Sequence, residues 1–174
     1  MSTAPGPVAR SVPSDAIIAE LEKLSITHVV CIPDSFQKTV IAKLMERATP
    51  RFFMVATEDE AMGVNAGLYA GGQNPMLLIQ NNGIFASINT IKAICLDAKV
   101  PTFIFVGQFQ RDVTKPVEEN SSRAVRMLEP TLATWGVPYF RLEGPDDLPN
   151  IERAYRTAWE TEGPAVLIVG APTS

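Results

Sequence analysis

Three acidic residues follow one another at the start of a predicted helix: Glu58, Asp59 and Glu60. Carboxylates of this kind can transfer protons as general acids or bases. The same residues also have a structural interpretation, because Thr57 can cap the helix while Glu60, three residues on, completes a capping box. The helix dipole further favours acidic side chains in a first turn. Taken alone, the pattern leaves a catalytic role and a structural role open.

The helix that follows carries glycines at positions 63, 67 and 71, and this spacing of four places them on one face. Inside a helix, Gly63 and Gly67 each cost about 1 kcal/mol of stability relative to alanine. When a helix has destabilising glycines along one face, the backbone on that face usually has to be free of side chains. We therefore expect another helix or a ligand to approach this stripe closely.

Two other polar segments directly follow apolar runs. Pro33-Asp34-Ser35 comes after residues 28–32, and an amide-rich segment from Gln80 to Gly83 ends the run at residues 76–80. Amides at the end of a buried strand must find hydrogen-bond partners, so the second segment is either an Asn-Gly turn or a polar wall for a ligand. Asp34 or Ser35 can equally well cap the next helix.

Apolar periodicity alternates between strand and helix along the chain. The expected strands are residues 28–32, 52–56, 76–80, 102–107, 138–142 and 165–169. The expected helices are residues 15–24 with Ser14 as N-cap, 36–46, 57–72, 87–97, 123–135 and 147–161. Continuously apolar strands separated by helices of this length indicate a mostly parallel sheet with helices on both faces. We predict one open, doubly wound α/β domain over residues 13–174, preceded by a disordered leader over residues 1–12.

Ligands of doubly wound sheets bind beyond the carboxyl ends of the strands. The three polar segments all follow strands, so we expect them to gather at one edge of the sheet. A fourth polar segment, from Gln108 to Ser121, follows the strand at residues 102–107 and has the composition of a long surface loop.

Composition excludes several classes of function. The net charge is −4 and basic residues form no run or stripe, so we expect no nucleic-acid partner. A run of about 18 apolar residues is absent, so we expect no membrane span.

Cys31 and Cys95 lie in apolar runs and are interpreted as core thiols, which favours a reducing, cytoplasmic location. We expect no metal site, because CxxC and HExxH spacings are missing, as are the Walker loop and the GxGxxG fingerprint. His28, the sole histidine, gives poor support for a Ser-His-Asp triad.

Three ordered motifs match a known family. They are Ile32-Pro33-Asp34-Ser35, then Glu58-x-Glu60-Ala61 leading to Ala66-Gly67-Leu68-Tyr69, and Leu78-Ile79-Gln80-Asn81-Asn82-Gly83. From about Ser14 to Val169 the chain resembles the pyrimidine-binding (Pyr) domain of thiamine diphosphate enzymes. The resemblance is strongest to the separate alpha subunit of sulfopyruvate decarboxylase and to phosphonopyruvate decarboxylase.

The resemblance implies a cofactor, thiamine diphosphate, and a catalytic carboxylate. In that family a glutamate lies nine residues before the helix glycine, and counting back from Gly67 gives Glu58. Glu60 is the second candidate and Asp59 the third. The family glutamate hydrogen-bonds N1′ of the cofactor's aminopyrimidine, which leads to deprotonation of the thiazolium C2 and decarboxylation of a 2-oxo acid.

The resemblance also assigns the other polar residues. Asp34, Gln80, Asn81 and Gly83 are expected on the cofactor side, together with Glu58, whereas Ser35 and Asn82 are expected on the substrate side. The relatives usually have serine where this chain has Asn82, which could signal a different substrate. In the Gln108–Ser121 loop, Arg111 and Lys115 could close the site or meet an anionic substrate tail; the alternative is a solvated loop.

The family holds the diphosphate through Mg²⁺ on a second domain that carries a GDG motif followed by Asn. This chain has no GDG. The resemblance therefore implies a separate beta subunit that holds Mg²⁺, with thiamine diphosphate bound between the two chains and a short 2-oxo acid, similar to sulfopyruvate or phosphonopyruvate, as substrate. Carboligation or another lyase reaction on the same cofactor remains an alternative, and so does a non-catalytic α/β regulatory or binding module.

Overall fold

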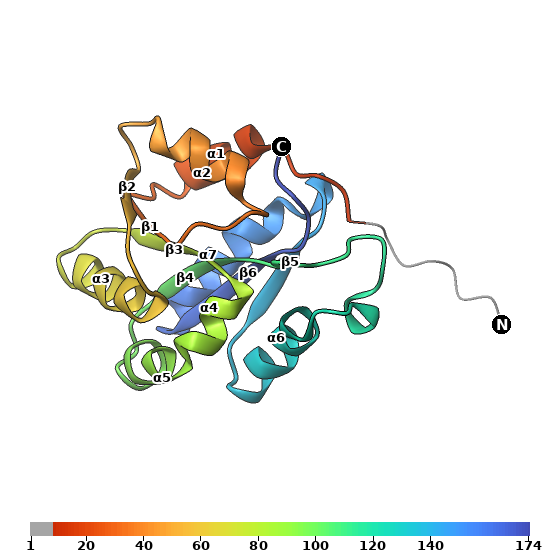
Figure 1. Ribbon diagram of the computed structural model, residues 1–174. Coiled ribbons are helices and arrows are strands. Elements are labelled where there is room, and N and C mark those ends of the chain that lie inside the picture. Colours follow the sequence, from red (N-terminus) through yellow and green to blue (C-terminus); the bar gives the residue numbers. More distant parts are fainter. Residues whose placement is uncertain (1–8) are drawn as a thin grey trace.

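The computed structural model describes residues 9–174, and these form one six-stranded sheet (Figure 1). The strands are β1 (His28–Cys31), β2 (Arg51–Met54), β3 (Pro75–Gln80), β4 (Thr102–Gly107), β5 (Tyr139–Leu142) and β6 (Pro164–Val169). Their order is β2-β1-β3-β4-β6-β5, and every neighbouring pair is parallel. The predicted doubly wound α/β fold is confirmed.

Helices cover both faces of the sheet (Figure 1). One face packs against α1 (Ser14–Lys23), α2 (Lys38–Met45) and α7 (Pro149–Glu160). The other face packs against α3 (Glu58–Ala70), α4 (Asn81–Ala86), the π-helix Ile91–Asp97 and α6 (Arg123–Thr134), with α5 (Ile88–Thr90) beside them. Two 3₁₀ turns, Val117–Glu119 and Pro145–Asp147, lie in the connections around α6 and β5.

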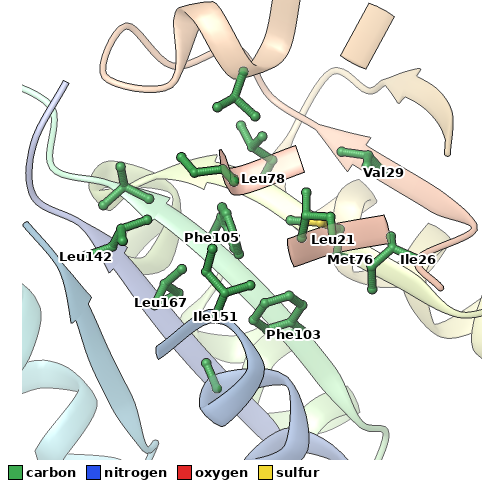
Figure 2. Packing of buried hydrophobic residues seen from close by; sticks show 14 of the residues in the cluster. Leu21, Ile26, Val29, Met76, Leu78, Phe103, Phe105, Leu142, Ile151 and Leu167 are labelled. Atoms are coloured by element: carbon green, nitrogen blue, oxygen red, sulfur yellow. The ribbon is translucent and has the colours of Figure 1, made fainter. Parts of the chain in front are cut away.

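The core divides into two apolar layers because successive strand side chains point to opposite faces. In β3, Met76 and Leu78 pack with α1, α2 and α7 (Figure 2), whereas Leu77 and Ile79 pack with α3, α4 and α6. All four side chains are fully buried. This burial on both faces explains why β3 is continuously apolar in sequence rather than alternating.

The amide segment after β3 differs from the predicted loop. Gln80 is extended, and Asn81 already begins the short helix α4. The side chain of Asn81 accepts a hydrogen bond from the backbone N of Asn82 at 3.0 Å, so it satisfies one of the free donors of the first turn. A break at Ser87, whose hydroxyl donates to the carbonyl of Gly83 at 2.6 Å, separates α4 from the helix predicted at residues 87–97.

Two expectations at the N-terminus also differ. Ser14 is the first residue of α1 rather than its N-cap, and its hydroxyl donates to Thr39 Oγ1 at 2.7 Å. Of the expected leader at residues 1–12, residues 1–8 lie outside the described part of the chain. Ala9 is buried and Val12 forms a parallel bridge with Thr173, so the domain extends before residue 13.

The parallel arrangement fixes where the polar segments lie. The loop with Asp34 follows β1, the acids of α3 follow β2, the amides of α4 follow β3, and the Gln108 loop follows β4. All four connections therefore leave the same, carboxyl edge of the sheet. Among residues 9–174, no helix has the length and apolar character needed to cross a bilayer.

Candidate active site

Glu60 takes part in capping the start of α3. Thr57 is the N-cap of α3, and its Oγ1 accepts a hydrogen bond from the backbone N of Glu60 at 3.2 Å. In return, the Glu60 carboxylate accepts from the backbone N of Ala56 at 2.7 Å. This reciprocal arrangement is a variant of the capping box that the sequence pattern predicted as the structural alternative. Glu60 is exposed.

Asp59 is also engaged within the chain. Its carboxylate accepts a hydrogen bond from the hydroxyl of Thr90. This contact joins the first turn of α3 to α5, on the same face of the sheet. Asp59 therefore helps to hold the two helices together.

Glu58 is the remaining acid, and its carboxylate is free. It is half-buried, and among residues 9–174 no hydrogen bond or ion pair engages its carboxylate. The side chain lies directly over Gly83 in α4: a Cβ atom built on that glycine would overlap Cγ and come within 2.8 Å of Oε1 and 2.9 Å of Cδ. The structure thus brings Glu58 and Gly83, two of the predicted site residues, into contact.

The amides beside Glu58 differ in exposure: Asn81 is buried, Gln80 is half-buried and Asn82 is exposed. Asn81 is fully buried, and its Nδ2 donates to the carbonyl of Phe109 at 3.3 Å, which ties α4 to the loop after β4. Asn82 is exposed and donates from Nδ2 to Gln80 Oε1 at 3.2 Å. Asn82 and Gln80 therefore present polar atoms at the edge, whereas Asn81 supports them from below.

Asp34 and Ser35 are neighbours with opposite exposure. Asp34 is 4% exposed, and its Oδ2 accepts from the backbone N of Gln37 at 3.1 Å. Its carboxylate lies against Gly107 at the end of β4, where a Cβ atom would overlap it. Burial raises the pKa of the Asp34 carboxyl, and hydrogen bonds from Gln37 and adjacent backbone groups partly oppose this rise. Ser35 is exposed, so it is the residue of this loop that a ligand can reach.

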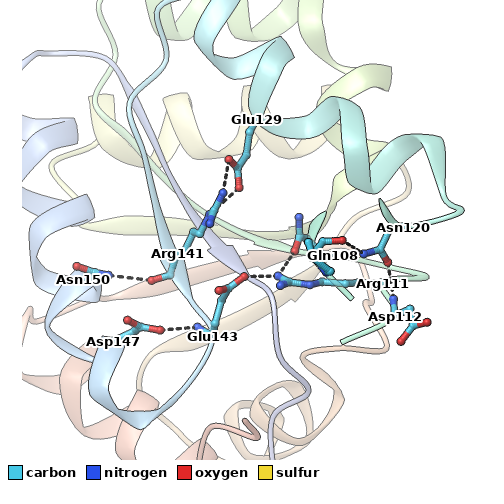
Figure 3. A network of polar contacts seen from close by, with 10 residues as sticks. Gln108, Arg111, Asp112, Asn120, Glu129, Arg141, Glu143, Asp147 and Asn150 are labelled. Carbon is cyan, nitrogen blue, oxygen red and sulfur yellow. Dashed lines mark hydrogen bonds and ion pairs between the residues drawn. The ribbon is translucent and has the colours of Figure 1, made fainter. Parts of the chain in front are cut away.

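In the Gln108–Ser121 segment, Arg111 is buried and paired, whereas Lys115 lies at the surface. The Arg111 side chain is 5% exposed; it forms an ion pair with Glu143 and donates to Gln108 Oε1 at 2.6 Å (Figure 3). Lys115 pairs with Asp112 at 3.1 Å. Arg111 thus holds the loop to the sheet instead of meeting a substrate tail.

Two buried glutamines at this edge were missed by the sequence reasoning. Gln37 is fully buried and donates from Nε2 to the carbonyl of Ile79 at 3.1 Å, which joins the loop after β1 to the end of β3. Gln108 is fully buried and accepts from Arg111. The local pattern gave no signal for either glutamine; Gly107, a glycine that ends a buried strand, marks the close approach of Asp34.

The glycine stripe of α3 faces outward. Gly63 and Gly67 are exposed, and a Cβ atom built on either meets nothing within 4 Å. Within residues 9–174, no other part of the chain makes the predicted close approach to this stripe. In residues 9–174, no group of three or more His, Cys, Asp or Glu side chains could hold a metal ion.

Comparison with known proteins gives a consistent relationship. No protein-family model matches the chain. It is 28% identical over 162 residues to sulfopyruvate decarboxylase subunit alpha from Methanococcus maripaludis, covering 91% of this chain and 94% of that subunit. The chain is similar to this subunit over almost its whole length. The corresponding subunit from Methanocaldococcus jannaschii is 27% identical over 133 residues, covering 76% of this chain and 77% of the relative. The resemblance identified from the three motifs is confirmed.

Solved structures support the fold. Benzoylformate decarboxylase from Polynucleobacter necessarius matches with a TM-score of 0.66 at 20% identity, covering 91% of this chain. A thiamin diphosphate-dependent enzyme from Mycobacterium smegmatis matches with a TM-score of 0.64 at 21% identity, covering 95% of this chain. The chain spans only 30% and 32% of those two structures, so it corresponds to one part of each.

The contact between Glu58 and Gly83 predicts a specific response to mutation. Gly83→Ala should lower the free energy of unfolding by about 1–3 kcal/mol, because the new methyl group displaces the Glu58 side chain. Gly63→Ala is the matched control and should raise it by up to about 1 kcal/mol, since that face is open. Urea unfolding measures both. In a Glu58→Ala background the penalty at position 83 should disappear; a penalty that persists there would contradict the contact.

The buried Asp34 carboxyl predicts a pH-dependent stability. Its pKa in the folded chain lies above the ordinary value, so the folded state binds this proton more tightly than the unfolded chain does. The resulting stabilisation is complete below about pH 4 and is lost as the pH rises through the folded-state pKa. Asp34→Asn removes this titration, so its stability relative to wild type should increase between pH 4 and neutral pH. A difference that stays constant with pH in urea unfolding would contradict the burial.

Proposed function

We propose that the chain is the alpha subunit of a thiamine diphosphate-dependent decarboxylase that acts on a short 2-oxo acid of the sulfopyruvate or phosphonopyruvate type. The observation that carries the proposal is the free carboxylate of Glu58. Of the three adjacent acids, Glu60 and Asp59 are engaged by hydrogen bonds within the chain, whereas Glu58 is half-buried and available. It is also the residue that the family spacing favours.

The residues at this edge fit the cofactor's pyrimidine ring. A carboxylate that no described residue engages can accept a hydrogen bond from a protonated ring nitrogen, and a half-buried setting strengthens that bond. Gly83 permits the Glu58 side chain to lie against the backbone of α4, because a Cβ atom at position 83 would overlap it. When bound, thiamine diphosphate supplies the electron sink that accepts the electrons left by departing carbon dioxide.

Glu58 then has one role, which is to hold the proton at N1′ of the aminopyrimidine. Its position is fixed from both sides: the capping interactions of Thr57 and Glu60 set the start of α3, and the backbone of Gly83 limits where the side chain can lie. Such preorganisation matters because a hydrogen-bonding group placed in advance needs no reorganisation during the reaction.

The exposed polar residues of the same edge are assigned to the substrate. Ser35 and Asn82 can donate hydrogen bonds to the carboxylate, sulfonate or phosphonate oxygens of a 2-oxo acid, and Gln80 lies beside Asn82. Asn81 and Asp34 are buried, so their part is to hold these neighbours in place. Asn81 and Gly83 contribute to the cofactor side through the shape of α4 rather than through exposed polar atoms.

The activity requires a second chain. The relatives from Methanococcus and Methanocaldococcus are named alpha subunits, and a sulfopyruvate decarboxylase from Methanosarcina acetivorans matches this chain over only 40% of its own length. The sequence lacks GDG and the described residues hold no metal cluster. We infer that a beta subunit binds Mg²⁺ and the diphosphate, and that it approaches the open face of α3 at Gly63 and Gly67.

Glu58→Gln should abolish decarboxylation in the reconstituted complex, with a loss of about 100-fold or more, because glutamine cannot take up the proton. Glu60→Gln is the matched control and should keep most of the activity, since glutamine also serves in a capping box. The measurement is carbon dioxide release from sulfopyruvate or phosphonopyruvate, with calorimetry of thiamine diphosphate binding. Full activity in Glu58→Gln together with loss in Glu60→Gln would reverse the assignment.

A larger side chain on the glycine stripe of α3 should weaken assembly with the beta subunit but should not unfold the isolated chain. Because nothing lies within 4 Å of a Cβ atom at position 67, both Gly67→Ala and Gly67→Leu should leave the isolated chain folded. In the mixture with the beta subunit, Gly67→Leu should weaken association at least about tenfold, which corresponds to roughly 1.4 kcal/mol. Gly67→Ala should weaken it less. Sedimentation of the mixture measures this, and unchanged assembly with leucine would rule out the stripe as the contact.

A further inference from the structure

A polar hollow lies at the edge of the sheet opposite to the candidate active site. It has a volume of about 550 Å³ and is open to solvent. Its lining comes from the first residues of β1 and β2 and from the three connections that lead into β1, β2 and β3: Thr27, His28, Thr49, Arg51 and Gln73. None of these residues takes part in the proposed reaction, and strands β1 and β2 separate the hollow from Glu58.

Arg51 and His28 stand next to each other in this hollow. They are partners in the parallel register of β1 and β2, so their side chains share one face of the sheet. Among residues 9–174, no carboxylate forms an ion pair with Arg51. Burial lowers the pKa of His28, and the charge of Arg51 lowers it further. The hollow therefore carries the guanidinium charge beside a neutral imidazole.

The His28 ring is fixed by two contacts. Its Nδ1 lies 2.8 Å from Thr27 Oγ1, which already accepts a hydrogen bond from the backbone N of Asn74 at 2.9 Å. In the tautomer in which the Thr27 hydroxyl donates to Nδ1, the ring proton lies on Nε2 and is free to donate to a ligand. The ring also stacks on Phe53, with centroids 5.7 Å apart and planes at 14°. A ring held this way loses little freedom when it binds a ligand.

We propose that this hollow binds a small oxyanion of the phosphate or sulfonate class. The guanidinium of Arg51 offers a planar fork that matches two oxygens of such a group. The imidazole Nε2–H, the Thr49 hydroxyl and the Gln73 amide are further donors among the lining residues. In the lining, donors and one positive charge are combined with no carboxylate, which selects an anion over a cation or a neutral ligand. The site is independent of the proposed decarboxylase reaction.

Nuclear magnetic resonance of the full chain tests the site directly, because His28 is the sole histidine and gives a single set of imidazole signals. Inorganic phosphate, methyl phosphate, methanesulfonate and acetate are titrated separately at constant ionic strength, with chloride as the reference. We expect a saturable shift of the His28 signals with the phosphates or the sulfonate and a smaller response to acetate. The relative affinities of free phosphate and its methyl ester show whether a free ion or a substituted group is the better ligand.

Variants distinguish a specific anion-binding site from a general effect of salt on surface charges. Arg51→Gln should weaken binding at least about tenfold, and Arg51→Lys, which keeps the charge but loses the fork, should weaken it less. Arg156→Gln removes the same charge from a distant surface, where Arg156 pairs with Glu152, and should leave the affinity unchanged. A shift that grows linearly with every anion, or that survives Arg51→Gln unchanged, would overturn the proposal.

Discussion

The contact between the Glu58 side chain and the backbone of Gly83 determines the geometry of the candidate active site. In the strand order, β1 lies between β2 and β3, so α3 must cross over β1 to join them. Its first turn therefore starts at the end of β2, and α4 starts at the end of β3 on the same edge. A residue with a side chain at position 83 would push Glu58 away. The glycine makes it possible for a carboxylate from one connection to lie across the next.

The same arrangement, a charged side chain that lies against a glycine, occurs at two other places along this edge. Asp34, from the connection after β1, lies against Gly107 at the end of β4, and Arg111 lies against Gly170 just after β6. In each case a charged side chain occupies the space that a Cβ atom would need. The buried layer beneath the edge is therefore polar and tied together by hydrogen bonds, including those of Gln37 and Gln108. A polar layer of this kind fixes loop positions through the hydrogen bonds it makes. Within residues 9–174, other buried atoms of the same side chains, such as Asp34 Oδ1 and Gln108 Nε2, have no hydrogen-bond partner.

The sequence predicted the sheet well and the site only in part. Continuous apolar runs separated by helical periodicity were enough to find all six strands and the parallel fold, since the four central strands are buried on both faces and the edge strands β2 and β5 are also mostly apolar in sequence. The pattern offered the capping box of Glu60, which is local, but it could not give the roles of Glu58 and Asp59, because these depend on Gly83 and Thr90, about 25 to 30 residues further along the chain. Spacing favoured Glu58 only after the family resemblance was considered.

Local sequence patterns also could not predict several other contacts, because their partners lie far away along the chain. Arg111 has the sequence context of a surface loop, yet its ion pair with Glu143 buries it, and that partner lies on another strand connection. The segment after β3 was expected as a loop because of its Asn-Gly composition. It forms the helix α4, in which the Asn81 side chain accepts a hydrogen bond from the backbone N of Asn82, and composition does not show this contact. The hollow at Arg51 and His28 depends on the register of two strands, which only the assembled sheet defines.

A structure of this chain in complex with its beta subunit and thiamine diphosphate tests the central claim most directly. The account predicts the Glu58 carboxylate within hydrogen-bonding distance of N1′ of the pyrimidine, with Gly83 beneath it and Glu60 still bound to the backbone of Ala56. A complex in which the pyrimidine contacts Glu60 or Asp59, or in which Glu58 faces solvent away from the cofactor, would contradict it.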